Sequence, residues 1–329
     1  MLSIKTKNLL YVLEIRLDNG KLQFLKFIAA KGFIPFPLLY LTGTYMKKKI
    51  QHILLGREKQ ISAEEVVKQP LPHKDFRFAN PLIVLHHLGP RTIAPGSTER
   101  IHPHPHRGFS PYTFMLQGEG FHRDNAGNDH IVKAGGVQWM FAGKGILHSE
   151  GPTDDLLKNG GIQESIQLWI NAPKSQKWNQ PFYQSASEDE QPLVIEQDGV
   201  SFRLASGTYN GQEGPVQQFT PVISMLGKIA AGKEVRLTAE AGYWTLLYII
   251  SGNVVVNDEP VNPYHLVIFE KENTDIALKA TTDAQVLFLS ADPLEEPVAA
   301  KDNFVMNTSE EIEQAIEDYK QGKFGNLSY

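Results

Sequence analysis

Short apolar runs separated by turn-forming residues dominate the chain from about residue 53 onward. The runs at residues 81–85, 111–116, 137–141 and 165–170 have the length of β-strands, and Gly, Pro and Asn cluster between them. Regularly spaced short strands with turn signals between them are typical of all-β sandwiches and barrels. The hydrophobic pattern therefore predicts an all-β fold.

Part of this pattern occurs twice. Residues 93–96 (Ile-Ala-Pro-Gly) have a counterpart at residues 229–232 (Ile-Ala-Ala-Gly), and the apolar run at 112–118 matches the run at 246–252, which also ends in glycine. Internal repetition at this scale indicates repeated structural units. Together with a length of 329 residues, it predicts two homologous β-domains.

The end of the chain has a different period. Thr308 and Glu311 have the spacing of a helix capping box. An apolar stripe at helical spacing follows, and Gly322 is the expected stop; the stripe consists of Ile312, Ala315, Ile316 and Tyr319. We expect a short C-terminal helix that packs on the core rather than binding a partner.

The first 45 residues are basic and apolar and differ from the rest. The longest uncharged run, 32–46, is too short to span a bilayer and contains Pro35 and Pro37. A small-residue cleavage site after a compact apolar stretch is missing, which argues against a signal peptide. We expect a disordered leader or an upstream translation artefact, with Met46 as the true start; a peripheral membrane anchor is the alternative.

Composition narrows the function classes. Charged residues make up 21% of the chain and the net charge is −5, so no basic surface for nucleic acid is indicated. There is no cysteine, which excludes disulfides, thiolate zinc sites and cysteine nucleophiles. A cysteine-free chain fits the cytoplasm, and any metal must be bound through nitrogen and oxygen.

Six of the eleven histidines lie between residues 102 and 148. In a β-strand, residues i and i+2 face the same side, so His104 points with His106, and His148 points with Glu150. Two such pairs on facing strands supply three imidazoles and one carboxylate. This set suits a first-row transition metal such as iron.

Two assignments in this cluster stay open. Glu150 can be a ligand or can lie beside the metal as a base. His102 offers an alternative register, with His102 and His104 as the pair, although the Arg-Gly-Phe sequence after His106 favours a rim position for His102. In the second repeat the matching stretch is 238–240 (Thr-Ala-Glu), and His265 is the one histidine after His148, so we expect that domain to lack ligands.

The motifs around these residues resemble the pirin family of two-domain cupins, which includes bacterial members described as quercetin 2,3-dioxygenases. The resemblance covers about residues 53–325, and four segments carry it: 104–109 (HPHRGF), 118–124 (GEGFHRD), 137–150 (from VQWM to GKGILHSE) and 304–308 (FVMNT). Long, ordered agreement of this kind is far more specific than a single short motif.

The resemblance implies two cupin (jelly-roll-like) β-barrels face to face, with a short C-terminal helix and one metal in the N-terminal barrel. The family's four ligands map onto His104, His106, His148 and Glu150. We therefore expect a leader at 1–45, a metal-binding cupin at 46–175, a cupin without ligands at 176–300 and a helical tail at 301–329.

The resemblance also implies a reaction. We expect a dioxygenase that acts on quercetin-like flavonols or related enolisable aromatics with dioxygen, in which Glu150 accepts the substrate's hydroxyl proton. Fe(II) is the expected metal, with Ni, Co, Mn, Cu and Zn as competitors. The alternative is a metal- or redox-gated regulatory protein that binds a protein partner without turnover; a purely structural metal is the third option. We expect a monomer with no membrane and no direct nucleic-acid contact.

Overall fold

The computed structural model describes residues 46–61, 65–98 and 100–327 with their side chains, and the backbone of residues 2–6, 9–18 and 21–29. The chain forms two compact units, 1–45 and 46–329. The first unit contains an antiparallel sheet of order β1-β2-β3, with β1 (Leu2–Thr6), β2 (Leu9–Asp18) and β3 (Lys21–Ala29). Most of the uncharged run at 32–46 lies outside the described residues, and the leader assignment stays a prediction.

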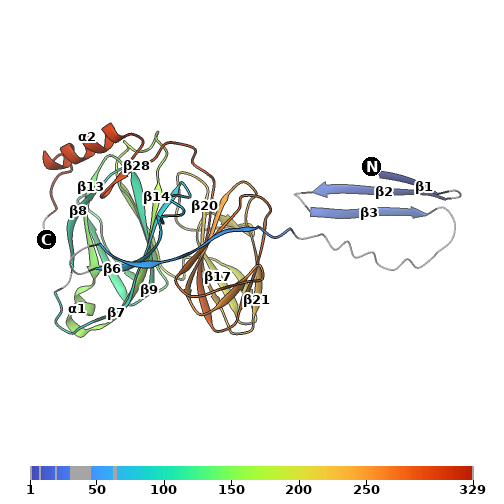
Figure 1. Cartoon of the computed structure of the whole chain (residues 1–329), viewed down its shortest axis with the longest axis horizontal. Helices are drawn as coiled ribbons and strands as arrows, with labels where there is room; N and C mark the ends of the chain where they lie inside the picture. The colour runs from blue at the N-terminus through green and yellow to red at the C-terminus, as the bar shows by residue number, and fades with distance from the viewer. Residues whose placement is uncertain are drawn as a thin grey trace. The chain divides into compact units, whose positions relative to one another are not determined.

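The second unit consists of two β-sandwiches, each made of one seven-stranded and one four-stranded sheet (Figure 1). In the first sandwich the large sheet has the order β15-β12-β9-β14-β7-β6-β5: β5 (Arg57–Gln60), β6 (Val66–Leu71), β7 (Leu82–Ile93), β9 (Phe109–Gln117), β12 (Val137–Phe141), β14 (Gly161–Asn171) and β15 (Phe182–Ala186). The small sheet has the order β11-β10-β13-β8: β8 (Ile101–His106), β10 (Glu119–Asp124), β11 (Asp129–Lys133) and β13 (Ile146–Pro152).

The second sandwich repeats this composition. Its large sheet has the order β16-β17-β20-β27-β22-β25-β4: β4 (Ile50–Leu55), β16 (Leu193–Gln197), β17 (Val200–Ser206), β20 (Val222–Ile229), β22 (Trp244–Ser251), β25 (His265–Phe269) and β27 (Ala284–Ala291). Its small sheet has the order β21-β26-β23-β24: β21 (Glu234–Thr238), β23 (Val254–Val256), β24 (Glu259–Val261) and β26 (Asp275–Ala280). Two short pairs complete the strands: β18 (Thr208–Tyr209) with β19 (Gln212–Glu213), and β28 (Ala299–Lys301) with β29 (Phe304–Met306).

The repeat predicted from the sequence is confirmed at equivalent turns. β7 and β20 both end at the isoleucine of the repeated motif. The glycines that follow, Gly96 and Gly232, have φ angles of 79° and 78°, in the left-handed region that favours glycine. The all-β class with two related β-domains is confirmed.

The two sandwiches exchange strands. β4 pairs with β25 in the second sandwich, although it precedes the first sandwich in the chain. β15 pairs with β12 in the first sandwich, although it follows residue 175. Each of these strands therefore belongs to the sheet of the other expected domain. The domain boundaries at 46–175 and 176–300 stay a prediction.

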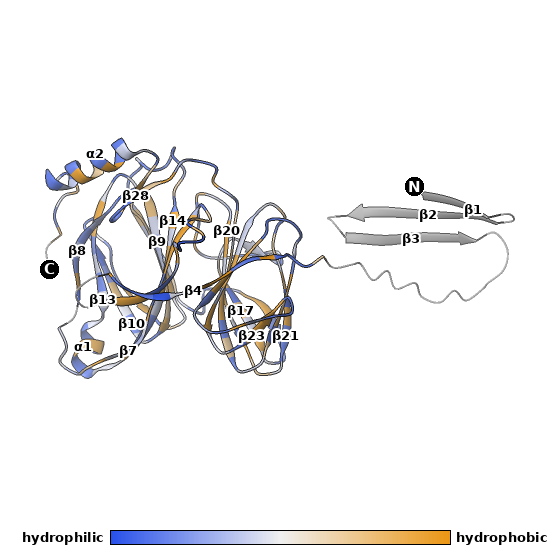
Figure 2. Ribbon diagram, viewed as in Figure 1, coloured by the Kyte–Doolittle hydropathy of each residue, from blue (hydrophilic) through white to orange (hydrophobic). Residues whose placement is uncertain are grey.

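The largest buried cluster joins the two sandwiches. It contains Tyr112 and Leu168 of the first large sheet together with Tyr248 and Leu287 of the second, so the two large sheets pack face to face. Figure 2 shows hydrophobic residues along the strands of both sandwiches. Polar contacts also cross this interface: His87 Nδ1 lies 2.9 Å from the Tyr248 hydroxyl, and Ser224 Oγ donates to the Tyr112 hydroxyl at 3.4 Å. Within the first sandwich, His87 Nε2 lies 2.9 Å from Glu164 Oε1.

The described residues form two short helices, α1 (Asp154–Asn159) and α2 (Ser309–Lys320), with α2 next to the β28–β29 pair (Figure 1). The predicted capping box is confirmed, since Glu311 N donates to Thr308 Oγ1 and the Glu311 carboxylate accepts from Thr308 N. Ile312 and Ala315 are buried, as expected for core packing. The prediction that Tyr319 packs on the core with this stripe was wrong, because Tyr319 is 41% exposed. Among the described helices, none is long and apolar enough to cross a membrane.

Candidate metal centre

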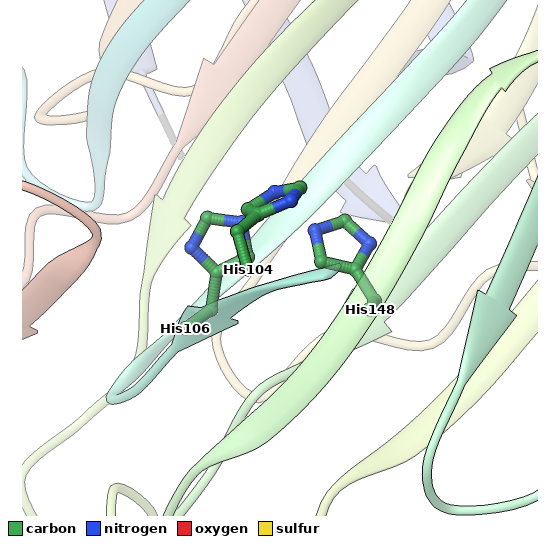
Figure 3. A group of neighbouring side chains, drawn as sticks. All are labelled: His104, His106 and His148. Carbon is green, nitrogen blue, oxygen red and sulfur yellow. The ribbon is translucent and has the colours of Figure 1, made fainter. Parts of the chain in front are cut away.

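Three of the predicted ligands meet on two neighbouring strands. β8 and β13 pair antiparallel, with His104 opposite His148 and His106 opposite Ile146. The ring centroids lie 4.3 Å apart for His104–His148, 4.9 Å for His104–His106 and 4.8 Å for His106–His148 (Figure 3). One ring nitrogen of each histidine lies within 4.8 Å of the others. The two strands are neighbours in one sheet.

Local sequence explains why β8 can carry this pattern. β8 is the edge strand of the four-stranded sheet, and Pro103 and Pro105 alternate with the histidines. Proline cannot donate a ladder hydrogen bond and is tolerated at sheet edges. Alternation then places His104 and His106 on one face and the two prolines on the other.

The Nδ1 atoms of the triad are held by neighbouring groups. His104 Nδ1 lies 2.9 Å from the His102 carbonyl oxygen, and His106 Nδ1 lies 3.3 Å from the Asn303 carbonyl oxygen. A carbonyl only accepts, so both Nδ1 atoms carry the proton and both Nε2 atoms carry a lone pair. His148 Nδ1 faces His122 Nδ1 at 3.4 Å.

The Nε2 atoms of His106 and His148 are buried and have no hydrogen-bond partner among the described residues. Buried polar atoms are nearly always satisfied, so two unsatisfied atoms in one histidine cluster point to a missing partner. Burial, followed by the positive charge that His104 can carry, holds the pKa of both imidazoles well below the ordinary value. Neutral imidazole is the form that binds metals, and the residues fit a divalent cation.

Glu150 lies beside this triad but does not belong to the group of close ligand atoms. Its Oε1 accepts a hydrogen bond from Gln167 Nε2 at 2.9 Å, and Gln167 Oε1 accepts from Trp169 Nε1 at 2.9 Å. The register between β13 and β8 also shifts between His148 and Glu150. The carboxylate is therefore held at the side of the site.

A cavity of about 80 Å³ adjoins Glu150 inside the first sandwich. Half of its sixteen lining residues are polar, and Phe121 is the one phenyl ring among the described lining residues; the polar set includes Thr113, Gln138, Gln163, Ser165 and Gln167. Pockets for drug-sized ligands measure roughly 300–1,000 Å³. This cavity is small and suited to hydrogen bonding.

Residues next to the three histidines have contacts of their own. His102 is exposed and contributes its backbone carbonyl rather than its ring to the triad, which agrees with a place at the rim. Arg107 points away from the metal site and pairs with Asp318 of α2 at 2.8 Å. His122 Nε2 lies 3.0 Å from Asp124 Oδ2.

Sequence reasoning missed several groups that shape the site. Gln167 and Trp169 stand at i and i+2 in a predicted strand, so their common face was readable, but their contact with Glu150 was not. Asn303 contributes only a backbone carbonyl and lies 197 residues from His106 in the chain. No side-chain pattern signals such a contact.

Among its described residues, the second sandwich has no equivalent group of ligands. Its interior is filled by apolar side chains such as Phe202, Leu237 and Val256. Its histidines lie apart from one another: His265 on β25 has Nδ1 3.0 Å from the Pro263 carbonyl oxygen, and the ring centroid of His52 on β4 lies 5.4 Å from that of Phe76. Over the described residues, the triad in the first sandwich is the one group of histidines and carboxylates with metal-binding geometry.

Two packed cupin-type sandwiches, one with a three-histidine centre and one with an apolar interior, define a metal-binding bicupin. The Pirin family model matches residues 61–170, and the model described as "Pirin C-terminal cupin domain" matches residues 225–325. The chain therefore belongs to the pirin family. The first matched segment contains all three histidines.

Known relatives cover most of the chain. Pirin-1 of Arabidopsis thaliana is 31% identical over 84% of this chain and 94% of its own length. A pirin-like protein of Solanum lycopersicum is 36% identical over 68% of this chain and 76% of its own length. A crystal structure named quercetin 2,3-dioxygenase from Acinetobacter baumannii is 32% identical, covers 86% of this chain and 100% of that chain, and has a TM-score of 0.81.

Proposed function

We propose that this pirin-family protein is a metal-dependent dioxygenase that acts on quercetin-like flavonols or related enolisable aromatics. The observation that carries the proposal is the pair of buried, unpaired Nε2 atoms in a histidine triad, with Glu150, which lines a cavity, two residues from His148. The similarity to a structure named quercetin 2,3-dioxygenase supports the substrate class. Location in the cytoplasm and a monomeric state stay predictions.

His104, His106 and His148 would hold the metal, and Glu150 is the proposed fourth member of the set. Imidazole and carboxylate donors suit Fe(II) first, with Ni, Co, Mn, Cu and Zn as alternatives. When bound, such a metal supplies Lewis-acid polarisation of a substrate oxygen and electron transfer with dioxygen.

Glu150 is placed to take a proton from the substrate. Gln167 donates to Oε1 of this carboxylate, and Trp169 in turn orients Gln167. A general base must lie within hydrogen-bond reach of the proton that it removes. Glu150 lines the cavity, whereas the three histidines of the triad do not, and its Oε2 would accept the hydroxyl proton of an enolic substrate bound there.

The polar cavity wall would orient the substrate. Thr113 and Gln138 supply hydroxyl and amide groups that can bind phenolic hydroxyl and carbonyl oxygens. A three-ring flavonol is larger than the cavity of about 80 Å³, so lining side chains must move for quercetin to enter. Smaller enolisable molecules fit this proposal with less movement.

The same small volume favours a second candidate function. In it, the metal and its oxidation state alter a surface of the first sandwich that binds a protein partner, without turnover. Both candidates use the histidine triad, so metal binding cannot separate them, whereas turnover can.

The direct test measures oxygen uptake and carbon monoxide release with quercetin. The full chain is freed of metal, reloaded with ferrous iron and compared with His106→Ala. Metal-dependent turnover that disappears in His106→Ala supports the dioxygenase. Absence of turnover with one iron bound per chain rejects it for quercetin and favours the regulatory protein.

A further inference from the structure

A buried chain of polar side chains leads away from the triad through His148. Its Nδ1 lies 3.4 Å from His122 Nδ1, and His122 Nε2 lies 3.0 Å from Asp124 Oδ2. All three residues are buried. They come from the paired strands β10 and β13, in which Asp124 stands opposite His148 and His122 opposite Glu150.

Asp124 is held as a fixed acceptor at the end of this chain. Its Oδ1 accepts from the backbone N–H groups of Ala126 and Asn128 at 3.0 and 3.1 Å, and the Asn128 amide donates to both carboxylate oxygens. Burial raises the pKa of Asp124, but hydrogen bonds from His122 and Asn128 outweigh it and bring the pKa below the ordinary value. The ionised carboxylate has no proton to donate.

This fixed acceptor determines where the protons sit. Because Asp124 can only accept, His122 Nε2 must carry a proton, and a singly protonated His122 then has a lone pair on Nδ1. His148 must therefore donate its own Nδ1 proton to His122. The lone pair of His148 is left on Nε2, the atom that is buried without a partner.

We propose that Asp124 and His122 are a positioning pair that fixes the tautomer and ring orientation of His148 for metal binding. The proposal rests on the proposed metal site. Metal-bound histidines usually donate their second N–H to a carboxylate, a carbonyl or water, and such partners control ligand basicity. Here a second histidine is interposed between His148 and its carboxylate.

The orientation of His148 differs from that of His104 and His106 in one testable respect. His104 and His106 are oriented by backbone carbonyls, which a side-chain substitution does not remove. His148 is oriented by side chains, so its tautomer can be changed by substitution.

Asp124→Asn changes that tautomer with little change in shape. The two backbone N–H groups at Oδ1 hold the amide oxygen at that position, which places the amide NH₂ against His122 Nε2. His122 must then carry its proton on Nδ1 and donate to His148, whose own proton moves to Nε2. That nitrogen has to lose a proton before it can bind a metal.

Substitutions at His122 distinguish loss of the hydrogen-bond acceptor for His148 from loss of aromatic packing. His122→Phe keeps an aromatic ring, which can still stack on Tyr183, but removes the acceptor. His122→Asn removes the ring but places an amide oxygen near the position of Nδ1, where it can accept from His148. Asp129→Asn is the matched control, because it makes the same charge change on exposed Asp129, whose partner is Arg123.

The experiment titrates Co(II) into the metal-free full chain and records its affinity and ligand-field absorption, together with the melting temperature of each metal-free variant. Asp124→Asn and His122→Phe are expected to weaken Co(II) binding by about 10- to 100-fold and to shift the absorption bands. His122→Asn should recover part of the affinity, and Asp129→Asn should match the wild type.

Two results overturn the inference: wild-type affinity and absorption in both Asp124→Asn and His122→Phe, or equal loss in His122→Phe and His122→Asn. The second result would mean that His148 needs no acceptor at that position. Failure of the metal site itself is distinguishable, because then the wild type would bind no Co(II), or His148→Ala would bind it as the wild type does.

Discussion

His148 on β13 lies directly opposite His104 on β8, with the ring centroids 4.3 Å apart. The metal centre is therefore set by strand register. A slip of one residue between paired strands turns each side chain to the other face of the sheet. Backbone pairing of β8 with β13 thus determines whether the two imidazoles meet, and the tail of the chain adds the carbonyl that orients His106.

Replacing the carboxylate beside the triad should separate binding from turnover. Glu150→Gln leaves the three imidazoles in place, so we expect metal to remain bound while quercetin turnover falls by at least about 100-fold through loss of the base. Metal content and oxygen uptake measure the two effects, and exposed Glu196→Gln serves as control. Loss of metal together with activity would instead make Glu150 an essential ligand.

The second sandwich should act as a scaffold. Phe202 is fully buried in its apolar interior, so Phe202→Ala is expected to lower the free energy of unfolding by about 3–5 kcal/mol. The folded variant should still bind one metal per chain. Urea unfolding and metal analysis test this, with Ile131→Ala, whose side chain is 60% exposed, as the control with little effect. A stable variant that lost its metal would contradict the scaffold role.

Lys177 should stabilise the loop that follows His106. Its buried Nζ donates to the Gly108 carbonyl at 2.6 Å, to Asn171 Oδ1 at 2.5 Å and to the Val305 carbonyl at 2.9 Å. Lys177→Met leaves these acceptors without this donor, and we expect a loss of about 3 kcal/mol in denaturant unfolding. Lys174→Met, on the exposed side of the same segment, should change little. Equal stability of the two variants would show that the buried ammonium is dispensable.

Acid should weaken the attachment of α2. Burial raises the pKa of Asp318, but hydrogen bonds from Lys323, Arg107 and Gln314 outweigh it and lower the pKa from 3.8 to about 2. A lowered carboxyl pKa gives stability that is present above the unfolded value near 3.8 and is lost as the pH falls through the folded value.

Asp318→Asn should consequently be less stable than the wild type at pH 6, and the difference should shrink as the pH falls from about 4 towards 2. The urea midpoints of both proteins, measured at each pH across this range, give the difference in stability. Other carboxyl groups contribute equally to both proteins, so their contribution cancels in this difference. A difference that stays constant with pH would show that the Asp318 charge does not stabilise α2.

Features encoded in neighbouring residues were readable from the sequence. The alternation in His104-Pro105-His106 predicted that the two histidines share one face of a strand, and the Thr308–Glu311 spacing predicted where α2 begins. The repeated glycine turns revealed two related domains. Each of these depends on local backbone geometry, which a short segment determines by itself.

Features that depend on distant segments were not readable. Tyr319 was assigned to the buried stripe of α2, but Asp318 is buried there because Arg107, far away in the chain, pairs with it. The exchange of β4 into the second sandwich also has no local signal, since its pattern fits either sheet. The hydrogen-bonded chain from His148 through His122 to Asp124 depends on the register of β10 with β13.

The central claim, a single metal held by the histidine triad, is tested most directly by metal stoichiometry. The full chain, stripped of metal and exposed to ferrous iron without oxygen, is analysed by elemental mass spectrometry alongside His106→Ala and His148→Ala. The account predicts one iron per wild-type chain and almost none in either variant, with all three proteins folded. One iron per chain in the variants, or none in the wild type, would contradict it.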